Sequence, residues 1–144
     1  APFWAFSGQW QHCVTLGEPA VEPLLAMLAA KVPRVRAEAA GALGAIGSPQ
    51  AITGLTRLLT DPASKVREVA AAALATIGGP AAADALLQAY RAEPDPSGRR
   101  DLLELALQLG PELLQPFLHS ALDDEAPLVR MLAEELQATR QLLS

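Results

Sequence analysis

Cysteine is almost absent from this sequence, and long apolar runs are missing altogether. Cys13 is the only cysteine in 144 residues, so no disulfide can form within the chain and nothing points to an oxidising compartment. No apolar stretch reaches the roughly 18 residues that a membrane-spanning helix needs. The first ten residues lack the basic start of a signal peptide, and Gly8, Gln9 and Trp10 interrupt their apolar run. We therefore expect a soluble, cytoplasmic protein with no membrane contact.

Basic residues and aromatic residues are also scarce. The chain has 11 Lys and Arg against 16 Asp and Glu, a net charge of −5, which argues against binding the phosphates of nucleic acid. Only 4% of the residues are aromatic although 51% are hydrophobic, so Ala, Leu and Val supply the apolar bulk. Because Ala and Leu are strong helix formers, this composition favours packed helices over sheets.

Reactive side chains are few and badly placed for chemistry. His12 and Cys13 are adjacent, but neighbouring residues of a helix point about 100° apart and do not face each other. His119 is the only other histidine, and neither a His-x-x-His nor a Cys-x-x-Cys spacing occurs. The sequence therefore predicts no catalytic residue, no metal and no cofactor.

Glycine and proline, by contrast, recur with a regular period. Four glycines lie 30, 31 and 32 residues apart, each preceded by an apolar residue and followed within two positions by a proline: Gly17, Gly47, Gly78 and Gly110. Gly just beyond a helix end and Pro in the first turn of the next helix is the usual asymmetry of such junctions. Ser48, before Pro49, is expected to cap the helix that starts at Pro49 through its hydroxyl.

Apolar residues recur at the same period in two helices of each unit, which we call A and B. The A stripe is Val21, Leu24 and Leu28; then Ile52, Leu55 and Leu59; then Ala83, Leu86 and Tyr90; then Leu114, Phe117 and Ala121. The B stripe is Ala39 and Leu43, Ala70 and Leu74, Leu102 and Ala106, Ala133 and Gln137, with small residues that allow close helix packing. This spacing indicates buried helix faces.

The repeats predict an all-α protein, an α-α superhelix of about four antiparallel helix pairs. A lone pair could not bury its apolar face, whereas stacked pairs share a continuous core. We place an N-terminal capping helix at 1–17 and repeats at about 18–47, 48–78, 79–110 and 111–144 of an array over 18–144. A helical bundle without repeats is the alternative.

The stretch LGEPAVEPLLAMLAAKVPRVRAEAAGALGAIGSPQA resembles a HEAT repeat of the short, PBS-lyase HEAT-like type, an armadillo-like α-solenoid. The resemblance is close from Leu16 to Gly79 and weaker beyond, where Gly98 replaces the valine before the repeated arginine. It implies a structural ladder of arginines and of acids six residues before them. The residues are Arg36, Arg67, Arg99 and Arg130 with Asp61, Glu93 and Asp124; Ala30 replaces the acid of the first unit. A substrate-binding row of arginines is the alternative.

Some proteins with similar repeats are enzymes, so the resemblance also raises three enzyme activities as alternatives. Bilin lyases share this repeat, but no residue here can be assigned to bilin chemistry. Iron-binding HEAT-like enzymes use His-Glu pairs, and neither histidine precedes Glu. A HEAT-like DNA glycosylase would be expected to line its groove with basic and aromatic residues. On the outward row of the B helices only Arg34 and Lys65 are basic, and no residue is aromatic.

The outward row of the B helices is the candidate binding surface. In HEAT stacks these helices line the concave side, and helical spacing places twelve residues on the row. Besides Gly41, Ala72 and Ser97, they are the nine residues that we expect to bind a partner: Arg34, Glu38, Lys65, Val69, Asp101, Glu104, Leu128, Leu132 and Glu135. The row becomes acidic toward its end, reinforced by Glu134, which favours a protein or peptide partner with a basic segment. A plain solvated face is the alternative.

Four aromatic residues near the start of the chain form a second candidate surface. Phe3, Trp4, Phe6 and Trp10 are expected to seal the open end of the stack, or alternatively to dock a partner. The other end has only Leu142 and Leu143 as a comparable seal, so self-association through the stack ends is possible. The sequence thus predicts a non-catalytic interaction module, a scaffold or adaptor, with a bilin lyase-like enzyme subunit as the alternative.

Overall fold

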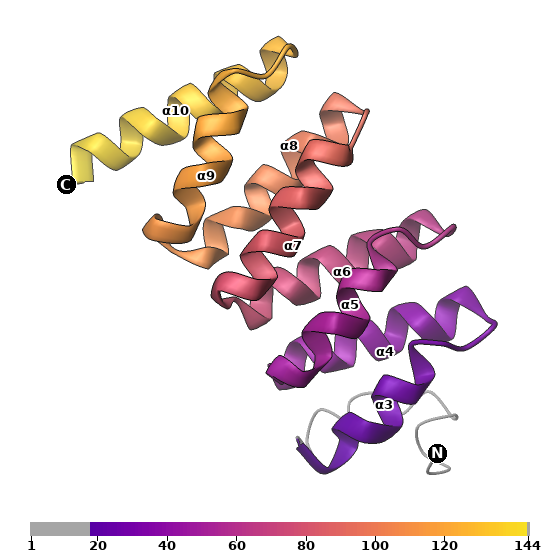
Figure 1. Cartoon of the computed structure of the whole chain (residues 1–144). Coiled ribbons are helices and arrows are strands. Elements are labelled where there is room, and N and C mark those ends of the chain that lie inside the picture. Colours follow the sequence, from indigo (N-terminus) through magenta and orange to yellow (C-terminus); the bar gives the residue numbers. More distant parts are fainter. Residues whose placement is uncertain (1–17, 144) are drawn as a thin grey trace. The chain divides into compact units, whose positions relative to one another are not determined.

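Helices follow one another along the whole of residues 18–143, the part of the chain that this computed structural model describes (Figure 1). No strand occurs in that part. The elements are η1 (Glu18–Ala20), α3 (Val21–Met27), α4 (Pro33–Ile46), η2 (Pro49–Ala51), α5 (Ile52–Leu58), α6 (Ser64–Ile77), α7 (Gly79–Ala92), α8 (Pro96–Ala106), η3 (Leu107–Leu109), α9 (Pro111–Leu122) and α10 (Pro127–Leu143). The predicted all-α architecture is confirmed.

The helices alternate as predicted between A (α3, α5, α7, α9) and B (α4, α6, α8, α10). The chain divides into two compact units, an N-terminal unit of residues 1–82 and a C-terminal unit of residues 83–144. In the N-terminal unit α3 packs on α4, α5 packs on α6, and the two B helices pack on each other. In the C-terminal unit α9 packs on α10, and α8 packs on both.

The junctions between repeats use glycine as predicted. Gly47 ends α4 in the left-handed conformation, with φ 78° and ψ 24°, and its N–H donates to the carbonyl of Leu43. A side chain would be strained at this φ, so the junction requires glycine. Pro49 then opens the next helical segment.

Ser48 does not cap that segment, contrary to our expectation. Its side chain makes no capping hydrogen bond, and its hydroxyl is buried without a partner among the described residues. The first turn is a 3-10 turn, in which the N–H of Ala51 donates to the backbone carbonyl of Ser48 at 3.1 Å. The backbone therefore already supplies the acceptor that the hydroxyl would have offered.

The predicted apolar stripes form the core. Leu24, Leu55, Leu86 and Phe117, which occupy the same position of successive repeats, are at most 1% exposed. In the B helices Leu43 and Leu74 are fully buried, but Gln137 at the corresponding position of α10 is half-buried. Ile52 and Leu59 are also only half-buried.

Small residues bring α4 and α6 unusually close together. A methyl group placed on Gly44 would lie 2.7 Å from Cβ of Ala73, far inside normal contact. One turn earlier, a methyl group on Gly41 would lie 3.7 Å from Cγ1 of Val69, an ordinary contact. The two B helices of the N-terminal unit are therefore in close contact at Gly44 and Ala73, and less close at Gly41 and Val69.

Candidate functional site: the arginine ladder and the B-helix faces

The ladder of the N-terminal unit has one complete rung. Asp61 follows α5, and its carboxylate accepts hydrogen bonds from Nε of Arg36 at 2.7 Å and Nη2 of Arg36 at 3.0 Å. The backbone N–H of Ala63 donates to the same carboxylate at 2.9 Å. Both charged side chains are largely shielded from solvent. The rung therefore joins the B helix of one repeat to the A–B turn of the next.

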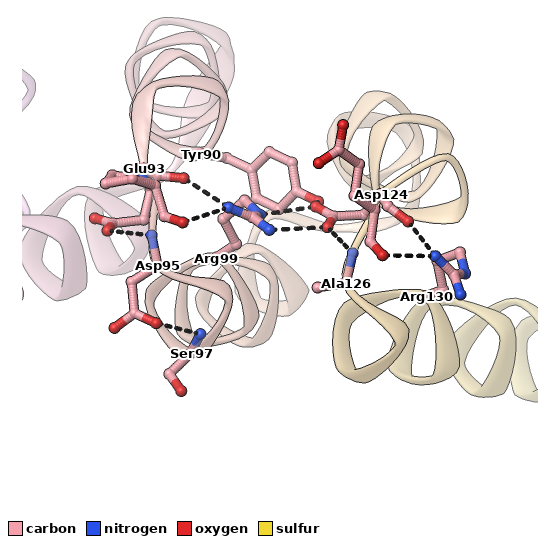
Figure 2. A network of polar contacts seen from close by, with 10 residues as sticks. Tyr90, Glu93, Asp95, Ser97, Arg99, Asp124, Ala126 and Arg130 are labelled. Carbon is pink, nitrogen blue, oxygen red and sulfur yellow. Dashed lines mark hydrogen bonds and ion pairs between the residues drawn. The ribbon is translucent and has the colours of Figure 1, made fainter.

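The C-terminal unit contains a richer rung, built around Asp124 (Figure 2). Arg99 donates to this carboxylate from Nε at 2.8 Å and from Nη2 at 3.0 Å, and the N–H of Ala126 donates at 2.9 Å. Tyr90 adds a fourth hydrogen bond, from its hydroxyl to Oδ2 at 2.6 Å. The Tyr90 ring, 3% exposed, also meets Phe117 edge to face. This side chain thus serves the core and the rung together.

All four ladder arginines also brace their own A–B turn. In each case Nη1 donates to the carbonyls of the residues six and five positions earlier. Because the acceptor is a backbone oxygen, Ala30 serves Arg36 as well as Asp61 serves Arg67. Asp61 and Asp124 therefore offer their carbonyls to the arginines six residues later, while their carboxylates bind the arginines of the preceding repeats. This pairing differs from the one that the resemblance implied, in which each acid pairs with the arginine six residues later.

Two of the ladder arginines have no carboxylate partner in the described part of the chain. Within residues 18–143, Arg67 and Arg130 make only their carbonyl hydrogen bonds. The position 25 residues after Arg67 is Ala92. Glu93, which the ladder also included, accepts from the N–H of Asp95 through its carboxylate.

The hydrogen bonds set the protonation of the rung residues. The side-chain hydrogen bond from Arg36 holds the pKa of Asp61 below its usual value, against the opposing effect of burial. Burial alone would raise the pKa of Asp124, but donation from Arg99, Tyr90 and Ala126 outweighs it and the net pKa is lowered. Both carboxylates are therefore ionised at neutral pH, as partners of arginines whose pKa values are raised. Each ion pair therefore links the B helix of one repeat to the A–B turn of the next.

Tyr90 gives a direct test of this rung. Burial raises the pKa of its phenol, and the hydrogen bond to Asp124 and the charge of Asp124 raise it further. We expect no ionisation near the ordinary value of about 10. Since the folded pKa lies above the unfolded one, the contribution of Tyr90 to stability is complete below about pH 10 and is lost as pH rises through the folded value.

The measurement is a spectrophotometric titration of tyrosinate, and Tyr90 is the only tyrosine. The midpoint should lie well above that of the urea-unfolded chain, and Asp124→Asn should lower it. A folded-state midpoint equal to the unfolded one would contradict the buried, hydrogen-bonded phenol.

The predicted surface residues of the C-terminal unit lie on two helices that pack together. Asp101 and Glu104 are exposed on α8, and Leu128, Leu132 and Glu135 lie on α10, with Leu132 half-buried and the others exposed. Glu104 pairs with Arg100 at 3.5 Å. Asp101 and Glu135 make no side-chain hydrogen bond or ion pair within the described part.

The predicted residues of the N-terminal unit form a separate row on α4 and α6. Arg34 is exposed and pairs with Glu38 at 3.1 Å, one helical turn away. Lys65 is exposed and Val69 is half-buried. This row is mixed in charge, unlike the acidic one.

Sequence reasoning missed Met131, the most exposed large apolar side chain of the described residues at 66%. It lies one position after the ladder arginine Arg130 and next to the projected row, three residues from Leu128. The signal that could have found it is composition: the corresponding residues of earlier repeats are Ala37, Glu68 and Arg100.

The remaining observations concern a surface hollow, metal binding and membrane crossing. A hollow of about 300 Å³ between α9 and α10 is lined by Gln115, Leu118, Gln137, Arg140 and Gln141, and Arg140 donates to Gln115. Over residues 18–143 no three His, Cys, Asp or Glu side chains gather where they could hold a metal. No helix found there has the length and apolar character to cross a membrane. Phe3, Trp4, Phe6, Trp10, His12 and Cys13 lie outside the described residues.

A comparison with sequence families and a comparison with solved structures both yield matches. A sequence model of HEAT repeats matches residues 21–108, more than half of the chain. A chain in the solved structure of the complex of CpcE and CpcF of phycocyanin lyase from Nostoc sp. PCC7120 is similar, with a TM-score of 0.64 and 27% identity. That match covers 87% of this chain and 86% of that chain. The search of curated proteins found no match.

Proposed function

This chain belongs to the family of HEAT-repeat proteins, and on that premise we propose that it is a non-catalytic interaction module, a scaffold or adaptor that binds a protein or peptide. Repeat stacks present extended surfaces to partners. The contacts of the rungs are accounted for by a structural role. The observation that carries the proposal is the face of α8 and α10, where exposed acids and exposed apolar side chains lie side by side.

Charge is distributed unevenly along the chain in a way that supports this face. The N-terminal unit has six basic and five acidic residues, a net charge of +1, and the C-terminal unit has five basic and eleven acidic residues, a net charge of −6. A partner with a basic segment would thus be drawn to the C-terminal unit. The mixed row of Arg34, Glu38, Lys65 and Val69 would make a secondary contact.

The first experiment is a pull-down from lysate of the native host with the intact chain and with Glu104→Lys/Glu135→Lys. We expect the variant to lose the partner, because two like charges now face its basic segment. Asp84→Lys/Glu112→Lys is the matched control: it makes the same change in net charge at exposed residues of the A helices α7 and α9. Equal retention by all three chains would reject the α8–α10 face as the binding site.

The likeness to a phycocyanin lyase complex supports a second candidate, a bilin lyase-like subunit. That structure contains two different proteins, so this candidate also calls for a protein partner. It differs in requiring a linear tetrapyrrole. Adding one to the chain and its captured partner should shift the visible absorbance spectrum if the second candidate is right, and should leave it unchanged for a scaffold.

A further inference from the structure

Of the three most exposed large apolar residues described in the C-terminal unit, Leu107 lies in η3, whereas Leu128 and Met131 lie together on α10. Leu128 is 44% exposed and Met131 is 66% exposed, and their spacing of three residues places them on the same helix face. Leu132, half-buried and four residues after Leu128, belongs to the same helix face. We call Leu128, Met131 and Leu132 the apolar strip. Large apolar side chains exposed together are a common mark of an interaction surface.

Acidic side chains accompany the strip on α10 and on the adjacent helix α8. Glu134 and Glu135 lie one turn further along α10, Asp101 lies on the adjacent α8, and all three are exposed. None of the three makes a side-chain ion pair among the described residues.

The basic groups of the same helices are already engaged. Arg99 binds Asp124, and Arg100 pairs with Glu104. Arg130 binds two turn carbonyls, and Arg140 binds Gln115. The flanking negative charge is therefore available to a partner.

Apolar contacts with charges at their edge match one kind of occupant. We propose that the strip receives a basic amphipathic helix of a partner protein, an inference that rests on the proposed function and specifies its partner. Apolar side chains of that helix would cover Leu128 and Met131, while its Lys or Arg residues would face Asp101, Glu134 and Glu135. An amphipathic helix supplies both, because its apolar and charged faces are adjacent.

The test uses the full chain and a synthetic probe. The probe is a labelled Leu–Lys peptide of about 18 residues, about five turns, patterned as an amphipathic helix. A scrambled peptide of the same composition and a Leu–Glu peptide of the same pattern are its controls. Affinity is measured by fluorescence anisotropy at low and at high salt. We expect the patterned Lys peptide to bind at least about tenfold more tightly than either control, and less tightly as salt rises.

Variants then locate the site. Leu128→Gln/Met131→Gln should weaken binding about tenfold or more. Val32→Gln should not, because Val32 is similarly exposed at 54% but lies in the N-terminal unit. Circular dichroism must show equal helicity for all chains. Three results would overturn the inference: equal binding of the scrambled peptide, undiminished binding by Leu128→Gln/Met131→Gln, or self-association in sedimentation that this variant abolishes, which would make a second copy the occupant.

Failure of this inference can be told apart from failure of the proposed function. A lysate partner that is lost with Glu104→Lys/Glu135→Lys but retained by Leu128→Gln/Met131→Gln would leave the interaction module standing and remove only the amphipathic helix as its ligand.

Discussion

Replacing Asp124 with Asn is expected to lower the free energy of unfolding of the C-terminal unit by about 3 kcal/mol, the lower end of the range for breaking a buried ion pair. The carboxylate is 6% exposed and accepts from Arg99, Tyr90 and Ala126. An amide has one acceptor oxygen in place of two, so it leaves part of Arg99 and the buried Tyr90 hydroxyl without a partner. The lower end applies because the Arg99 side chain keeps 16% of its surface in solvent.

Urea unfolding followed by circular dichroism would measure this loss, with Tyr90 absorbance as a probe of the C-terminal unit alone. Asp123→Asn is the control, since Asp123 is an exposed carboxylate at the adjacent position and its loss should cost little. Similar losses for the two variants would mean that the rung does not stabilise the unit.

Acid should remove the stabilising contribution of the two rung carboxylates, Asp61 and Asp124. The pKa of Asp124 and the pKa of Asp61 are both lowered by folding, from an unfolded value of about 3.9. Their contribution to stability is therefore complete above about pH 4 and is lost as pH falls through the lower folded values. Asp124→Asn should lose less stability than the natural chain over that interval, because one of the two titrating carboxylates is gone.

A second large effect is expected at the contact between α4 and α6, where Gly44→Ala should destabilise the N-terminal unit by about 1–3 kcal/mol. Alanine normally stabilises a helix interior relative to glycine by about 0.5–1 kcal/mol. Here the added methyl would lie 2.7 Å from Cβ and 2.8 Å from Cα of Ala73, so the helices must separate. Neither obstacle is a flexible side-chain end, which makes relief costly.

Gly41→Ala provides the control within the same helix. Its methyl would meet Cγ1 of Val69 at 3.7 Å, so the propensity gain should survive and the variant should be slightly more stable than the natural chain. The two substitutions should thus change the melting temperature in opposite directions. An increase for both would show that α4 and α6 can move apart freely.

Local chemistry made much of the fold predictable. Gly47 and Pro49 mark a helix junction because each has one strong backbone preference, and Leu24, Leu55, Leu86 and Phe117 are buried because their spacing leaves a single face. Full burial was the wrong prediction for Gln137, Ile52 and Leu59, which are half-buried. Periodicity identifies the inward face of a helix but not how fully a neighbouring helix covers it.

The polar contacts were harder to predict because they depend on stacking. Arg36 lies six residues after Ala30 and 25 before Asp61, and only the placement of consecutive repeats shows that its carboxylate partner is the distant one. The sequence predicts that Tyr90 is a core residue, but not that its hydroxyl donates to Asp124, 34 residues away. Met131 lies one residue outside the projected row, where small errors in helical phase decide exposure.

The short sequence span of the rungs has a consequence for how the protein folds. Each rung closes a loop of only 25 residues, and the entropy lost on closing such a loop is modest. Chains whose contacts are mostly local cross the folding barrier quickly, and in repeat arrays the ordered region can nucleate in any repeat and spread to its neighbours. Folding of this chain should accordingly be rapid and should depend little on the number of repeats that it contains.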